Sequence, residues 1–146
     1  MKKLTLDFYE QNSMSSIGIS CQLTDYKMLF NINKTLKYQF KRVDNLVINV
    51  AKIKGSFSLY FFDDLSNERK IYLLSNNDNG NILISELKQF DYFFIVDSNA
   101  DDDYMNEIAK KIKGISQVIF TQNIDLEKVK NYDVFCEEFD SHIDTI

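Results

Sequence analysis

The chain has 146 residues, of which 45% are hydrophobic and 27% charged, as in an ordinary globular domain with its own core. Its formal charge of -5 at pH 7 disfavours binding to nucleic acids or insertion among anionic lipids, because those partners attract a positive protein surface. We therefore expect a single domain over residues 1–146, with neither a nucleic acid partner nor membrane insertion.

The first expected element is a strand from Lys3 to Phe8, where Leu4, Leu6 and Phe8 alternate with polar residues. Asp7 interrupts the apolar stretch after a few residues, so neither the core of a signal peptide nor a transmembrane span follows. These features favour a cytoplasmic protein.

The segment from Thr24 to Tyr38 changes to the spacing of an amphipathic helix, with Thr24 and Asp25 as favourable opening residues. A helix of this kind packs its apolar side against a core. The apolar stripe expected here consists of Tyr26, Leu29, Phe30 and Leu36.

Three strand-like segments follow at residues 46–50, 56–62 and 70–75, and short polar joints separate them. The joint between the last two is close to the length of a hairpin connection, which favours antiparallel pairing. After them, Asn79 and Gly80 tolerate the positive φ angles of a tight turn. These patterns predict an antiparallel meander.

The segment from Tyr92 to Val96 is apolar at every position, as in an inner strand that is covered on both faces. The aromatic strand at residues 56–62 also carries large apolar groups on both faces. Because one helix layer covers one face, we expect a protein partner or a second copy of the chain to provide the other cover.

A second helix is expected from Asp101 to Gly114, because aspartates fill its first turn and lysines its last, as the helix dipole favours. Its apolar stripe consists of Tyr104, Ile108 and Ile112. With a strand at residues 116–120, it completes a β-α-β unit from Tyr92 to Phe120. The sequence thus predicts an α+β fold: a mainly antiparallel sheet of about five to six strands, two principal helices and a C-terminal β-α-β unit.

The end of the chain is harder to assign, although residues 125–132 favour a short helix. Residues 133–146 are acidic and could form a separate C-terminal tail. Phe139 and Ile143 lie four residues apart within it, so we consider both as candidate residues for binding a partner.

The residues that usually carry catalysis or hold cofactors do not form recognisable patterns. The sole histidine, His142, lies near the end of the sequence, and the four glycines are scattered singly, so no phosphate-binding loop is expected. Asp97, Asn99 and Asp101 imitate the start of a calcium-binding loop, but Asp102 stands where that loop requires glycine. We expect no catalytic residues, no metal site, no cofactor and a protein that is not an enzyme.

The segment ISELKQFDY, from Ile84 to Tyr92, resembles the motif of the IPExxxVDY family of small bacterial proteins. Glu86, Asp91 and Tyr92 stand where the motif expects them, whereas Ser85 replaces its proline and Phe90 replaces its valine with another apolar residue. The segments IGISCQLTDYK and SFSLY are also similar to that family. The resemblance implies a bacterial source and implies no particular activity.

Two interpretations of this segment remain open. In the structural one, Ser85 caps a short helical turn, Asp91 fixes the turn into the next strand and Tyr92 starts its buried face. In the functional one, Glu86, Asp91 and Tyr92 form a polar binding site at the mouth of the β-α-β unit.

Two functions follow from these patterns. The first is a non-catalytic protein–protein interaction or accessory module of the bacterial cytosol, motivated by the apolar strands and by Phe139 and Ile143. The alternative is a regulatory domain that binds a small molecule or RNA through Glu86 to Tyr92.

Overall fold

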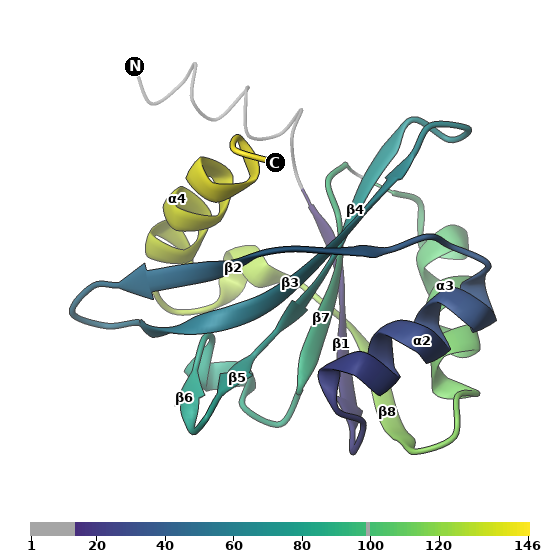
Figure 1. The fold of residues 1–146 in the computed structure, drawn as a ribbon, viewed down its shortest axis with the longest axis horizontal. Coiled ribbons are helices and arrows are strands. Elements are labelled where there is room, and N and C mark those ends of the chain that lie inside the picture. The colour runs from purple at the N-terminus through teal and green to yellow at the C-terminus, as the bar shows by residue number, and fades with distance from the viewer. Residues whose placement is uncertain (1–13, 99) are drawn as a thin grey trace.

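The computed structural model describes residues 14–98 and 100–146, and the strand expected from Lys3 to Phe8 lies outside them. A six-stranded sheet in the order β2-β3-β4-β7-β1-β8 forms the centre of the fold, and every neighbouring pair is antiparallel (Figure 1). Its strands are β1 (Ser15–Cys21), β2 (Lys41–Asn49), β3 (Lys54–Asp64), β4 (Arg69–Ser75), β7 (Tyr92–Val96) and β8 (Val118–Ile124). The predicted α+β class is confirmed.

Helices cover both faces of this sheet. Figure 1 shows α2 (Asp25–Leu36) and α3 (Asp102–Lys113) on one side and α4 (Tyr132–Ile143) on the other. The sheet therefore separates two hydrophobic cores. Each helix in the part of the chain that the structure describes is too short or too polar to cross a bilayer.

The strand β7 is buried along its whole length, as its uniformly apolar sequence predicts. Phe94 and Val96 belong to the core beneath α2 and α3, whereas Phe93 and Ile95 belong to the core beneath α4. Both covers come from the chain itself. The expectation that a partner or a second copy covers one face of this strand is therefore wrong.

The predicted meander is present as β2, β3 and β4, which pair in sequence order. A further hairpin, β5 (Asn77–Asp78) with β6 (Asn81–Ile82), follows β4. Its turn places Asn79 at φ 50° and Gly80 at φ 97°, which are the positive angles that this dipeptide tolerates best.

The β-α-β unit is present, but another strand divides it. β7 and β8 both run antiparallel to β1, so they are parallel to each other with β1 between them. Asp101 caps the N-terminus of the crossover helix α3, and its side chain accepts a hydrogen bond from Tyr104 N at 2.8 Å.

The helix α2 is close to its predicted boundaries, but the stripe expected on it is wrong in part. Its buried residues are Met28, Ile32 and Leu36. Tyr26 and Phe30 are 77% and 59% exposed, because they lie on the side of the helix turned away from the sheet. Apolar residues on both sides of this helix concealed which side faces the core.

Residues 133–146 are not a separate tail, because most of them belong to α4. Phe135 and Phe139 are each 1% exposed and pack into the core on that face of the sheet. The charged residues that suggested a tail occupy the other side of the helix, as in any amphipathic helix at a surface.

Truncation of Ile108 to Ala is expected to cost about 2 to 5 kcal/mol of the free energy of unfolding, because the side chain is 5% exposed in the middle of the α3 stripe. Urea unfolding measures this loss. Ile119→Ala is the matched control, since Ile119 is 58% exposed and should cost much less. Equal losses in the two variants would contradict the packing of α3.

Candidate functional site

Asp91 fastens the start of β7 to the neighbouring strand β1. Its Oδ2 atom accepts a hydrogen bond from Cys21 N at 2.9 Å, and its own N–H donates to Ile19 O at 2.7 Å. Asn76 N donates to Asp91 O at 2.9 Å from the end of β4. Asp91 thus ties three strands together, in agreement with the structural interpretation of this residue.

Tyr92 connects β7 to the beginning of α2. Its side chain is 4% exposed, and its hydroxyl donates to Asp25 Oδ1 at 2.6 Å. Ser58, on β3, donates to the other oxygen of the same carboxylate. Burial and the hydrogen bond to Asp25 raise the pKa of Tyr92, so the phenol remains a neutral donor.

Glu86 lies in a short 3-10 helix, η1 (Ser85–Leu87), and makes a different connection. Its Oε1 atom accepts a hydrogen bond from Lys130 N, in the loop before α4. The expected cap by Ser85 is absent, because the capping position is Ile84 and no side chain makes a capping hydrogen bond there. The turn therefore starts one residue earlier than predicted.

The structure therefore brings Asp91 and Tyr92 together and leaves Glu86 apart. A cavity of about 590 Å³ is lined by Asp91, Tyr92, Asp25 and Arg42, and Glu86 does not reach it. Most of its polar groups already bond within the protein. Arg42 Nη2, for example, donates to Asn45 Oδ1 at 2.8 Å.

This cavity also lies at the wrong end of the β-α-β unit for the functional interpretation. Asp91 and Tyr92 stand at the amino end of β7, whereas α/β proteins bind ligands beyond the carboxyl ends of parallel strands. The three motif residues do not form one binding site.

Asn76 is the most extensively bonded side chain around the motif, and sequence reasoning missed it. It is fully buried at the end of β4. Its Nδ2 atom donates to Leu87 O and to Phe90 O, each at 3.0 Å, and its Oδ1 atom accepts from Ile84 N at 2.8 Å. One amide thus satisfies three backbone groups of the segment from Ile84 to Phe90.

Phe90 occupies the apolar position of the motif, and its ring packs against β1 and β8. A Cβ atom added to Gly18 of β1 would lie 2.7 Å from the ring of Phe90, so the ring rests directly on the glycine backbone. The same ring stacks on Phe120 of β8, with centroids 6.1 Å apart. The ring of Phe90 therefore anchors the segment from Ile84 to Tyr92 on the strands β1 and β8.

Phe139 and Ile143 contribute to the core rather than to an exposed binding surface. The ring of Phe139 packs edge-on against Tyr72 of β4, with centroids 5.2 Å apart. Ile143 is partly buried against the same cluster. Phe139 is thus withdrawn from the surface, whereas Ile143 keeps part of its surface exposed.

Both thiols have a pKa above the ordinary value for cysteine. Burial raises the pKa of Cys21, and it raises the pKa of Cys136 to about 11 despite a hydrogen bond from Tyr132 that lowers it. A thiolate is the reactive form of cysteine, so neither side chain is an activated nucleophile.

The two edges of the sheet differ in charge. The edge strand β2 carries Lys41, Arg42 and Asp44, and an irregularity in its pairing falls between Val43 and Leu46. Charges and bulges of this kind protect a sheet edge from pairing with another chain. The edge strand β8 has the sequence VIFTQNI and no charged residue.

The outer edge of β8 is regular over five residues. Ser20 pairs with Phe120 and Cys21 with Val118, so Ile119 is bulged and Phe120 to Ile124 keep an even register. Among the described residues, no strand pairs with this outer edge. Phe120 is 44% exposed beside it.

No family model matches the chain, and no curated protein matches it either.

Proposed function

We propose that the chain is a non-catalytic protein–protein interaction module of the bacterial cytosol, and that it binds a second copy of itself through the outer edge of β8. The observation that carries this proposal is the uncharged edge from Phe120 to Ile124. Unpaired backbone groups on such an edge form a template for another strand.

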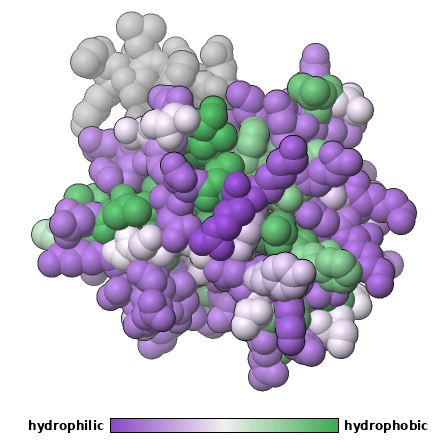
Figure 2. Space-filling model, viewed as in Figure 1, coloured by the Kyte–Doolittle hydropathy of each residue, from purple (hydrophilic) through white to green (hydrophobic). Residues whose placement is uncertain are grey.

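The face of the molecule drawn in Figure 2 offers less to a partner. Figure 2 shows that hydrophilic residues dominate the visible face and that hydrophobic residues form small separate patches on it. Such scattered residues are normal on a monomer and indicate no docking site by themselves. Backbone pairing at β8 does not require a large apolar surface, because main-chain hydrogen bonds supply much of the affinity.

A second copy fits this edge because the strand is self-complementary. With a two-fold axis at Gln122, antiparallel pairing places Phe120 of one copy opposite Ile124 of the other. Thr121 then lies opposite Asn123, and Gln122 lies opposite its own copy. No like charges meet across the pair, although the whole chain carries a charge of -5.

Sedimentation equilibrium of the purified chain is expected to show a dimer that Gln122→Lys weakens at least about fivefold, because two ammonium groups would face each other. Gln39→Lys adds the same charge at an exposed position outside both edges and should leave the dimer unchanged.

Mixing the Gln122→Lys and Gln122→Glu variants should restore association, since opposite charges would then meet at the axis. A wild-type chain that stays monomeric at all concentrations would contradict the proposal. Equal effects of the variants at positions 122 and 39 would contradict the pairing at β8.

A further inference from the structure

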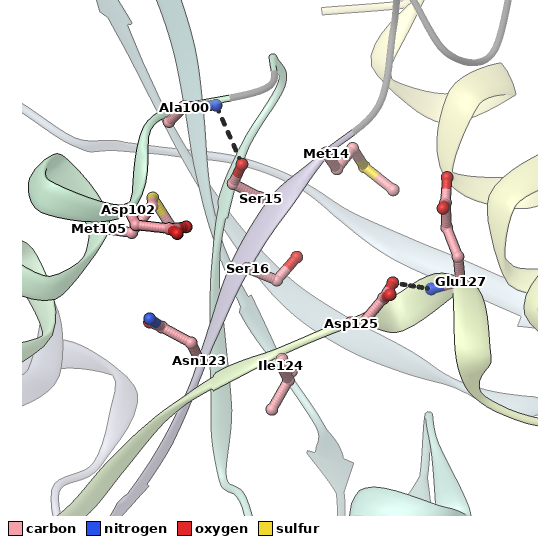
Figure 3. A pocket seen from close by; sticks show the side chains of 10 residues that line it. All are labelled: Met14, Ser15, Ser16, Ala100, Asp102, Met105, Asn123, Ile124, Asp125 and Glu127. Carbon is pink, nitrogen blue, oxygen red and sulfur yellow. Dashed lines mark hydrogen bonds between the residues drawn. The ribbon is translucent and has the colours of Figure 1, made fainter.

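A smaller cavity, of about 310 Å³, lies where β8 ends and β1 begins. This is the carboxyl end of the parallel strands β7 and β8, the place where α/β folds most often bind ligands. Figure 3 shows side chains from β1, β8, α3 and the loops beside them around this space. Its lining is Met14, Ser15, Ser16, Ala100, Asp102, Met105, Asn123, Ile124, Asp125 and Glu127.

Within residues 14–98 and 100–146, the hydroxyl of Ser16 is a buried polar group without a hydrogen-bond partner. The residue is 3% exposed, and no described atom forms a hydrogen bond with its Oγ. In Figure 3 this hydroxyl points toward the side where Asp125 and Glu127 lie. By contrast, Ser15 Oγ accepts from Ala100 N at 3.0 Å. A buried hydroxyl left unpaired costs free energy, and a ligand with a polar hydrogen removes this cost.

The described residues that line the cavity and carry a charge are all acidic. Among the residues that the structure describes, Asp102, Asp125 and Glu127 line it, and no lysine, arginine or histidine does. Asp102 also occupies the first turn of α3, and Asp101 already caps that helix, so the positive end of the helix dipole offers no anion site. These charges favour a cation.

The arrangement fits an organic cation better than a metal ion. Nowhere in the described ranges do three or more carboxylate, thiol or imidazole groups gather closely enough to hold a metal. Met14, Met105 and Ile124 add an apolar surface that a hydrated ion would not use but that methylene groups can contact.

We propose that this cavity binds a small organic cation that carries a primary ammonium group on a short aliphatic chain. Ser16 Oγ accepts a hydrogen bond from the ammonium group, and Asp125 provides the opposite charge. The thioether of Met14 contacts the aliphatic chain. The cavity shares Asn123 and Ile124 with the pairing edge of β8, whereas Ser16 and Asp125 lie outside that edge, and its occupation does not require self-association.

The test titrates the full chain with 1,4-diaminobutane and, separately, with 1,4-butanediol, which has similar length but no charge. Nuclear magnetic resonance or calorimetry is expected to detect the diamine and not the diol. Ser16→Ala should weaken diamine binding about tenfold, because it removes a hydrogen bond to a charged group. It removes an unpaired hydroxyl, so the fold should survive.

Two further variants separate the site from general attraction to an acidic protein. Asp125→Asn keeps an acceptor for Glu127 N but removes the charge, and should also weaken diamine binding. Asp103→Asn removes a carboxylate that does not line the cavity and should have no effect. Unchanged binding by Ser16→Ala, equal losses in the variants at positions 125 and 103, or no binding to the wild-type chain would overturn the proposal.

Discussion

Removal of residues 133–146 is expected to unfold the whole domain. The deletion takes away Phe135 and Phe139, which are each 1% exposed, and leaves one face of the sheet uncovered. Loss of a single buried phenylalanine costs about 3 to 5 kcal/mol, and a domain of this size has about 5 to 15 kcal/mol in total. Far-ultraviolet circular dichroism and thermal unfolding measure the outcome.

The matched control for this deletion removes only residues 144–146, which follow α4 and are exposed. That chain should keep its cooperative unfolding transition. If the longer deletion also kept native ellipticity and a cooperative transition, then α4 would not be part of the core, and Phe139 and Ile143 would be available to a partner.

Asn76→Ala is expected to cost about 3 kcal/mol of the free energy of unfolding, an unusually large effect for a polar residue. The change leaves Ile84 N and the carbonyl groups of Leu87 and Phe90 without their side-chain partner in a buried place. Ile84 N and Phe90 O lose this hydrogen bond in a buried place without regaining water, whereas Leu87 O still accepts from Phe90 N at 3.0 Å. Urea unfolding of the variant gives the value.

Asn49→Ala is the control for the loss of an asparagine from a strand, because Asn49 is exposed at the end of β2. It should cost less than about 0.5 kcal/mol. If Asn76→Ala lost as little free energy of unfolding as Asn49→Ala, the segment from Ile84 to Phe90 would not depend on the buried amide of Asn76.

The elements with strong local signals were predictable. The strands β3, β4 and β7 are rich in β-branched and aromatic residues, and the turn at Asn79 and Gly80 needs the positive φ angles that these residues tolerate. The helix α3 carries complementary charges at both ends. These features depend on neighbours in the chain.

The strand β1 was missed because its sequence, SSIGISC, has a weak strand pattern and is stabilised by contacts with distant parts of the chain. Gly18 weakens any strand pattern, yet the ring of Phe90 occupies the space where a side chain would be. The position of β1 between β7 and β8 also depends on pairing between distant segments, which a local pattern does not encode.

The residues of the candidate sites were predictable only in part. The sequence correctly placed Asp91 and Tyr92 at the start of β7. Their hydrogen bonds to Cys21 and Asp25 were not predictable, because these partners lie in distant segments of the chain. Asn76 stands in a run of turn-forming residues and looks like one more of them. Its role depends on burial, which no local pattern showed.

Amide hydrogen exchange along β8 tests the central proposal most directly, because it reports on the edge itself. If two copies pair there, the outward-facing amides between Phe120 and Ile124 should exchange more slowly as the protein concentration rises, and Gln122→Lys should abolish the change. Rapid exchange of these amides at every concentration would show that the edge of β8 stays open to solvent and would contradict the proposed interaction.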